Sequence, residues 1–251
     1  MFNETTKIVY LSPHLDDVAL SCGGLVWQQT QAGTPVQVWT VCAGDPPAGP
    51  FSAYAQAHHA RWGTGPEAIV VRREEDVASL AILGARARHL DIPDAIYRRN
   101  PVSGAAYVNA NEQLFGEVDP AETALIERIA AELLELLPPA AQVVCPLTLG
   151  HHIDHQIVRA AAERLGRSLW YYADYPYAVE DAEKIARLVP AGARADVFPV
   201  SAAALSAWQA SVAAHHSQIS TFWPNPETMQ IAIKQYSEQV GGVRIWQSLV
   251  G

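Results

Sequence analysis

Residues 7–24 read KIVYLSPHLDDVALSCGG, and this stretch decides the fold. Lys7–Leu11 is a short apolar run with β-branched residues, which predicts a buried strand. A polar turn over Ser12–Asp17 follows, and a helix-like segment then reaches about Ala32. A strand, a turn and a helix in this order form the first half of a βαβ unit.

The rest of the chain repeats this alternation. Further strands are expected at Val36–Cys42, Arg88–Leu90, Gln142–Cys145, Ser168–Tyr172 and Ala195–Pro199. Helices are expected at Arg72–Leu83, Ala121–Leu137, His152–Leu165, Asp181–Leu188 and Ala202 to about Ser217. The pattern predicts a single α/β domain over residues 1–251, with a doubly wound, mainly parallel sheet, helices on both faces and a smaller C-terminal extension.

Two stretches lack the alternation of strand and helix patterns, Ala43–Pro66 and Asp91–Pro120. We expect irregular loops here, and loops of this length in a compact domain commonly enclose a substrate. His58 and His59 lie in the first stretch, where a solvated pair is favoured over a substrate lid. Gly23–Gly24 is expected to allow close packing of the first helix on the sheet.

Composition excludes several classes of protein. The formal net charge is −9, which disfavours nucleic acid and anionic membrane surfaces as partners. The apolar runs are too short to cross a bilayer, and the N-terminal segment lacks the pattern of a signal peptide. The cysteines are odd in number and form no C-x-x-C pair: Cys22, Cys42 and Cys145. We expect buried free thiols and a cytoplasmic location; a homo-oligomer is left open.

Two groups of metal-capable residues follow predicted strands. PHLDD occupies residues 13–17 and GHHIDH occupies residues 150–155. Doubly wound sheets bind ligands at the carboxyl ends of their strands, so the two groups are expected to converge. Taken alone, either group is as readily a helix cap or a surface ion pair.

The spacing suggests a catalytic zinc site. Such sites take three protein ligands and leave a fourth position for water, and His14, Asp17 and His155 are the expected ligands. Asp16 is then placed to accept a proton from the water. An aspartyl nucleophile of a phosphatase is an alternative for Asp16, but the two histidine groups do not fit it.

Two further residues of the second group are given roles. His152 is expected to stabilise the oxyanion or to protonate the leaving amine. Asp154 is expected to orient one of the histidines.

These residues also resemble a known family. SPHLDDVALSCGG at residues 12–24 resembles the P-H-x-D-D…G-G signature of the PIG-L/LmbE family of zinc-dependent N-acetylglucosaminyl deacetylases. Three shorter matches follow in the family's order: R-x-x-E…L-G at residues 72–84, H-x-D-H at residues 152–155 and H-x-[ST]-Q at residues 215–218. Together they span most of the chain.

The resemblance implies a Rossmann-like fold and a hydrolase that removes an N-acetyl group from an N-acetylglucosamine-type sugar or glycoside. It implies the same metal ligands, base and histidine catalyst, with Zn²⁺ bound and another divalent ion such as Fe²⁺ possible. It also adds Arg72 and Asp94 as residues that contact the sugar; a surface salt bridge is an equal alternative for each.

The sequence departs from the family at three places, and two other functions stay open. Leu15 and Val18 stand where the family often has proline and glutamate, and His151 makes the register of the second motif ambiguous. A metal-dependent hydratase of an unsaturated organic acid would use basic residues, for which Arg72, Arg73, Arg98 and Arg99 are available. A catalytically silent sugar-binding module is the other alternative.

Overall fold

The structure is a computed structural model that describes residues 8–179 and 182–248. Seven strands form one sheet in the order β3-β2-β1-β4-β5-β7-β6. Their bounds are β1 Ile8–Ser12, β2 Val36–Thr40, β3 Arg86–His89, β4 Gln142–Pro146, β5 Leu169–Tyr172, β6 Arg194–Phe198 and β7 Val243–Gln247. β1 to β5 are parallel, and β7 pairs antiparallel with both β5 and β6.

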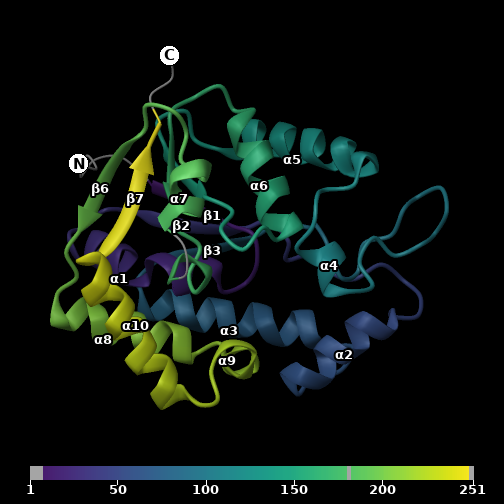
Figure 1. Cartoon of the computed structure of the whole chain (residues 1–251), viewed down its shortest axis with the longest axis horizontal. Coiled ribbons are helices and arrows are strands. Elements are labelled where there is room, and N and C mark those ends of the chain that lie inside the picture. The colour runs from purple at the N-terminus through teal and green to yellow at the C-terminus, as the bar shows by residue number, and fades with distance from the viewer. Residues whose placement is uncertain (1–7, 180–181, 249–251) are drawn as a thin grey trace.

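Helices cover both faces of this sheet (Figure 1). α5 (Thr123–Leu136) and α6 (Ile153–Glu163) lie on one face, where Ile129, Leu133 and Ile157 are fully buried. The other face is covered by α1 (Asp17–Gln31), α3 (Ala68–Ile82), α8 (Ala202–Ala213) and α10 (Pro226–Val240). The expected doubly wound α/β architecture is confirmed.

The order in which strands are added to the sheet reverses beside β1. The chain runs from β1 outward to β2 and β3, and it then returns to add β4 on the other side of β1. Open α/β sheets bind ligands in the crevice at such a switch point. The residues after β1 and those after β4 therefore share this crevice.

Smaller helical elements complete the described structure. They are α2 (Ala53–Trp62), α4 (Asn111–Leu114), η1 (Pro120–Glu122), η2 (Tyr177–Val179), α7 (Ala182–Leu188) and α9 (His216–Phe222). Four of them, α2, α4, η2 and α9, contribute residues to the crevice. The expectation of a wholly irregular stretch over 43–66 is wrong, because α2 forms there. Ser52 caps this helix by accepting from the N–H of Ala55 at 3.1 Å, and Gly63 ends it in a left-handed conformation (φ 65°).

The C-terminal region differs from expectation in two ways. The helix expected to about Ser217 ends at Ala213, and α9 starts separately at His216. α10 and β7 were not predicted; Asn225 caps α10, and Gly241 ends it with φ 80°. Lys7 and Asp181, at the ends of two expected elements, lie outside the described residues.

Gly23 and Gly24 pack against a helix, not against the sheet. A Cβ at Gly23 would lie 2.5 Å from Cδ1 of Trp208, and one at Gly24 would lie 3.0 Å from Val200 and from the same indole. The two glycines thus let α8 approach α1 closely. Trp208 is fully buried and donates a hydrogen bond to the carbonyl of Leu20 at 3.1 Å.

The remaining expectations on composition concern cysteines and the membrane. Cys22, Cys42 and Cys145 are buried free thiols, as expected; a cytoplasmic location stays a prediction. Within residues 8–179 and 182–248, no helix has the length and hydropathy needed to span a bilayer.

Candidate active site

The loop after β1 is shaped by its own side chains. The hydroxyl of Ser12 donates to the carbonyl of His14 at 2.6 Å, and the backbone N–H of His14 donates to Asp17 Oδ2 at 2.7 Å. Asp17 is the first residue of α1, where the helix dipole favours a carboxylate. The loop thus holds His14 and Asp17 together at the end of β1.

The loop after β4 turns sharply into α6. Thr148 and His151 both have left-handed backbone, with φ values of 70° and 62°. His152 caps α6, because its Nδ1 accepts a hydrogen bond from the N–H of Asp154 at 3.1 Å. The His151 side chain is 47% exposed and lies 3.1 Å from Glu117. Adjacent histidines therefore face different surroundings, one the crevice and the other solvent.

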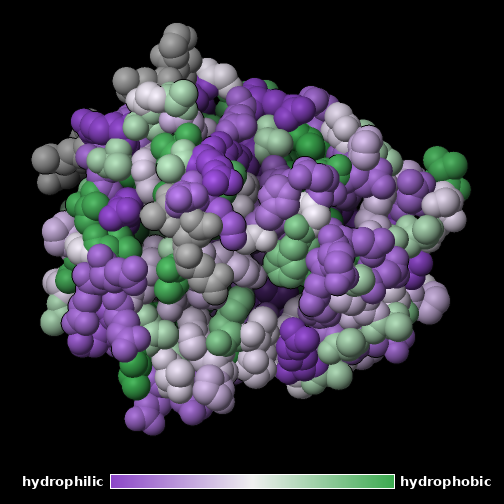
Figure 2. All heavy atoms as spheres, in the orientation of Figure 1, coloured by the Kyte–Doolittle hydropathy of each residue, from purple (hydrophilic) through white to green (hydrophobic). Residues whose placement is uncertain are grey.

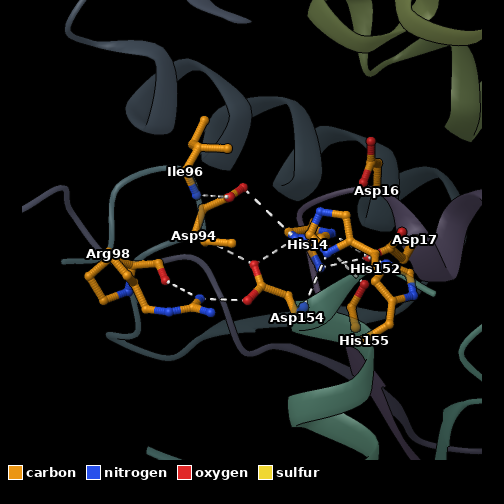
Figure 3. A network of polar contacts seen from close by, with 12 residues as sticks. His14, Asp16, Asp17, Asp94, Ile96, Arg98, His152, Asp154 and His155 are labelled. Carbon is orange, nitrogen blue, oxygen red and sulfur yellow. Dashed lines mark hydrogen bonds and ion pairs between the residues drawn. The ribbon is translucent and has the colours of Figure 1, made fainter. Parts of the chain in front are cut away.

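Three imidazoles gather around the carboxylate of Asp17 (Figure 3). Asp17 Oδ2 lies 3.1 Å from His14 Nδ1 and 3.3 Å from His155 Nε2. The ring centroids of His14 and His152 are 4.6 Å apart, and those of His14 and His155 are 5.3 Å apart. One ring nitrogen from each histidine lies within 4.8 Å of the others. The two sequence motifs therefore form one cluster.

The donor set fits a divalent transition metal. Two imidazole nitrogens and a carboxylate oxygen are ligands used by zinc and by ferrous iron. In His155 and in His14, the ring nitrogen that points away from Asp17 already has a carboxylate partner. His155 Nδ1 lies 2.6 Å from Asp174 Oδ1, and His14 Nε2 lies 3.0 Å from Asp154 Oδ2. Such partners orient metal-binding histidines. The inner nitrogens, His14 Nδ1 and His155 Nε2, are left facing Asp17.

The carboxylates of the cluster favour positive charge on two of its imidazoles. Burial by itself would lower the pKa of His155, but Asp17 and Asp174 raise it to about 9. Burial opposes a raised pKa at His14 as well, yet Asp17 and Asp154 hold that pKa well above its usual value. Positive charge is therefore stabilised at this position, which is the condition that a bound cation needs.

His152 differs from the other two imidazoles. Burial, followed by the nearby His14, lowers the pKa of His152 well below its usual value. The ring is therefore neutral, and because Nδ1 accepts from a backbone N–H, its proton resides on Nε2. His152 lines the pocket and so presents a hydrogen-bond donor to it.

A buried ion-pair network fixes Asp154. Arg98 Nη1 lies 2.5 Å from Asp154 Oδ1, and Arg98 Nε lies 2.6 Å from Glu122. Asp154 Oδ2 also accepts from the N–H of Ala95 at 2.9 Å. Figure 3 shows Arg98 on the side of Asp154 opposite the imidazoles. The structure thus places Asp154 against His14, and its orienting role stays a prediction.

Asp16 lies beside the cluster, with an arginine as its neighbour. Its carboxylate makes no capping hydrogen bond to α1, and Oδ1 lies 3.7 Å from Arg72 Nη2. Burial raises the pKa of Asp16 to about 6, although Arg72 opposes this shift. Arg72 Nη1 also lies 3.7 Å from Asp94 Oδ2, and its guanidinium lies 4.8 Å from the centre of the Trp62 ring. Arg72 and Asp94 are buried at the pocket rather than at the surface.

The three imidazoles, the carboxylates beside them and Arg72 line a cavity of about 330 Å³. It is visible as a recess near the centre of Figure 2, between the positions of α3 and α4. One wall comes from α2, which contributes His58, Arg61 and Trp62. The expectation of a solvated pair at His58 and His59 is wrong. His59 is buried with its Nε2 2.7 Å from the Tyr97 hydroxyl, and His58 lines the cavity.

Two residues of the site were missed from the sequence. Asp174, the partner of His155, follows β5 by two residues, and its position after a strand was an available signal. Glu75 accepts from the N–H and the hydroxyl of Ser217, at 2.8 and 2.6 Å. This contact joins the R-x-x-E segment of α3 to the H-x-[ST]-Q segment at α9, two motifs that the sequence could not connect.

Known proteins are similar to this chain in sequence and fold. A curated 2'-N-acetylparomamine deacetylase of Niallia circulans is 27% identical over 197 residues, which cover 70% of each chain. The crystal structure of a zinc-inhibited form of teicoplanin deacetylase is 29% identical, with a TM-score of 0.82 over 96% of this chain and 97% of that one. The structure of the A40926 pseudoaglycone deacetylase is 31% identical, with a TM-score of 0.70 over 98% and 97%.

A family model also matches. The model described as "PIG-L: GlcNAc-PI de-N-acetylase" aligns with residues 9–165, which contain β1 to β4, α1 and α6. The matched region therefore includes both histidine motifs and the crevice between them. The family resemblance of the motifs is confirmed, and the chain belongs to the PIG-L family of GlcNAc-PI de-N-acetylases.

Proposed function

We propose that the chain hydrolyses the acetamide of an N-acetylated amino sugar carried by a glycoside, with Zn²⁺ held by His14, Asp17 and His155. The observation that carries the proposal is the position of Asp17 Oδ2, 3.1 and 3.3 Å from the two inner imidazole nitrogens. Support also comes from the names of the relatives, which are deacetylases of 2'-N-acetylparomamine, of teicoplanin and of the A40926 pseudoaglycone.

The proposed metal and Asp16 both act on the attacking water. A divalent ion held by these ligands would polarise the acetyl carbonyl and make water more acidic. The carboxylate of Asp16 accepts the proton of the attacking water, because this group is buried beside the cluster and is not used to cap α1. A pKa raised by burial makes a carboxylate a better proton acceptor near neutral pH.

His152 stabilises the oxyanion that forms on the acetyl oxygen. Its Nε2–H is the donor that faces the cavity, and its neutral state suits hydrogen bonding better than proton transfer. The proton that Asp16 has taken up is then available to the leaving amine. This division of roles assigns Asp16 as both base and acid, a choice that the sequence left open.

Arg72 and Asp94 bind the sugar. The guanidinium of Arg72 is fixed between Asp16, Asp94 and the ring of Trp62, and a planar guanidinium can bind two adjacent hydroxyl groups. Asp94 is oriented by the N–H of Ile96, which donates to Oδ1 at 3.1 Å. Its Oδ2 lies 3.7 Å from Arg72 Nη1 and 3.9 Å from His14 Nε2, beyond hydrogen-bond distance of either, and can accept from a sugar hydroxyl.

The arginines disfavour the alternative of an acid hydratase. Arg98 is paired inside the protein, Arg73 lies 2.5 Å from Asp45, and Arg99 donates to the carbonyls of Pro50 and Gly104. Of the four candidates only Arg72 lines the cavity, and it already faces Asp16 and Asp94. Three of the four arginines proposed to hold a dicarboxylate therefore do not reach the cavity, whose described arginines are Arg72 and the exposed Arg61.

Acetate release from methyl N-acetyl-β-glucosaminide tests the proposal. We expect release with Zn²⁺, loss after treatment with a chelator and recovery when Zn²⁺ is added back. Assays of N-acetylated aminoglycosides and of an unsaturated dicarboxylate run alongside. Hydration of the dicarboxylate without acetate release would replace deacetylation by the hydratase, and chelator-insensitive sugar binding without turnover would indicate a binding module.

A further inference from the structure

A row of aromatic rings leads away from His152 along one wall of the cavity. The ring of Phe115 meets His152 edge-on, with centroids 5.5 Å apart and an angle of 86°. Tyr177 follows at 6.2 Å from Phe115, and Phe222 follows at 6.4 Å from Tyr177. All three rings line the cavity and are only partly buried. The wall therefore exposes aromatic surface that the proposed reaction at the acetamide does not use.

Each ring is held in place by the protein around it. Phe115 ends α4, and α4 is tied to α2 by the hydrogen bond from the Tyr54 hydroxyl to Asn111 at 2.6 Å. Tyr177 lies over Gly150, where a Cβ would come within 2.6 Å of the phenol ring. Phe222 is the last residue of α9, whose first turn is fixed by the Glu75–Ser217 contact. The aromatic wall is thus preorganised, which reduces the entropy lost on binding.

Charge around the cavity is unevenly distributed. Its carboxylates, Asp16, Asp17 and Asp94, all lie at the histidine cluster. Among the described lining residues, the two arginines are Arg72, which lies beside those acids, and the exposed Arg61. Among the described residues that line the cavity, no carboxylate lies along the aromatic wall, so a polycationic aglycone would form no ion pair with them, whereas a flat apolar group can pack against the rings there.

We propose that Phe115, Tyr177 and Phe222 form a subsite for an aromatic aglycone of the acetylated amino sugar. The inference rests on the proposed function, because it places the acetamide at the cluster and the rest of the substrate beyond His152. The aglycone then packs against the rings of three different segments, η2, α9 and the end of α4. The chain therefore selects aryl glycosides over small alkyl glycosides and over cationic aminocyclitol glycosides.

The test compares kcat/KM for acetate release from 2-naphthyl and methyl N-acetyl-β-glucosaminide. We expect the wild-type protein to favour the naphthyl glycoside by about tenfold, the effect of one to two aromatic contacts, mainly through KM. Phe222→Ser and Phe115→Ser should each reduce this ratio several-fold. Ile231→Ser, at an exposed apolar position of α10, is the matched control and should leave the ratio unchanged.

A second measurement does not depend on variants that fold or on turnover. 2-Naphthyl β-glucoside, which has no acetamide, should bind the wild-type protein at least several-fold more tightly than methyl β-glucoside in calorimetry. Equal binding of the two glucosides, or a higher kcat/KM for N-acetylparomamine than for the naphthyl glycoside, would overturn the subsite. Absence of acetate release from every glycoside, with naphthyl binding retained, would instead overturn the proposed function.

Discussion

Arg98 pairs with both Glu122 and Asp154, and Asp154 in turn contacts His14. Arg98 Nη1 lies 2.5 Å from Asp154 Oδ1, while Asp154 Oδ2 lies 3.0 Å from His14 Nε2. Burial would raise the pKa of Asp154, but Arg98 and then His14 keep it well below its usual range. The carboxylate therefore stays ionised and can fix the imidazole of a proposed metal ligand.

Replacing Arg98 should weaken both stability and metal binding. Arg98→Met leaves Glu122 buried without its cation and Asp154 with His14 as its remaining charged partner, and we expect the free energy of unfolding to fall by about 3–5 kcal/mol. We expect zinc affinity, measured by competition with a chromophoric chelator, to fall by about 10–100-fold. Arg99→Ala, whose contacts are to exposed loop carbonyls, is the control. A folded Arg98→Met protein with unchanged zinc affinity would limit Arg98 to a structural role.

The proposed base can be separated from the proposed ligands. Asp16→Asn keeps the size of the side chain but removes the proton acceptor, so acetate release should fall by about 10²–10⁴-fold. Zinc content measured by atomic absorption should remain near that of the wild-type protein. Turnover within a few fold of wild type would exclude Asp16 as the base.

Replacing a proposed metal ligand should cause loss of the metal. His155→Ala removes one of the two imidazoles that face Asp17, and it leaves Asp174 buried without its partner. We expect little bound zinc after dialysis against metal-free buffer, and a lower melting temperature than for the zinc-loaded wild-type protein. Full zinc occupancy in this variant would contradict the ligand assignment.

The neighbouring histidines His151 and His152 provide a matched pair. His152→Ala removes the Nε2–H donor and should lower kcat by about 10²–10³-fold, as the loss of an oxyanion donor does. His151→Ala removes only the exposed contact with Glu117, so its kcat should match that of the wild-type protein. Equal losses in the two variants would show that the register of the second motif is misassigned.

The glycine pair of α1 gives a prediction about stability alone. Gly23→Ala places a methyl group 2.5 Å from the indole of Trp208. Overpacking costs about 1–3 kcal/mol, and the higher helix propensity of alanine returns about 1 kcal/mol, so a net loss of up to about 2 kcal/mol is expected in urea unfolding. Gly65→Ala is the control, because its new Cβ would meet only the flexible carboxylate of Glu67. A stabilised Gly23→Ala protein would contradict the tight contact.

The sequence predicted those parts of the fold that carry periodic or local signals. The strand and turn at residues 8–17 and the helix after residue 152 were expected from runs of apolar residues and from cap-forming side chains. The family and the deacetylase reaction expected from the motifs are confirmed by the family model and the named relatives. The individual roles of the site residues stay predictions.

Other features depend on contacts between distant segments. α2 has few core-facing residues, only Ala55 and His59 being buried, so no strong hydrophobic period marked it as a helix. β7 pairs with β5 and β6, and its antiparallel insertion leaves no local trace in the sequence. Arg98 resembled a free cation that could bind substrate, because its partners Glu122 and Asp154 are 24 and 56 residues away.

The Glu75–Ser217 contact joins the region matched by the family model to the C-terminal segment that follows it. The match to the family model stops at residue 165, yet α8 fills the space above Gly23, and α9 supplies Gln218 and Phe222 to the cavity. A fragment cut after α6 would keep every proposed metal ligand but would lose Asp174, one wall of the cavity and the cover over α1. The two histidine motifs carry the proposed metal ligands, while the segment after residue 165 supplies part of the wall that bounds the cavity around them.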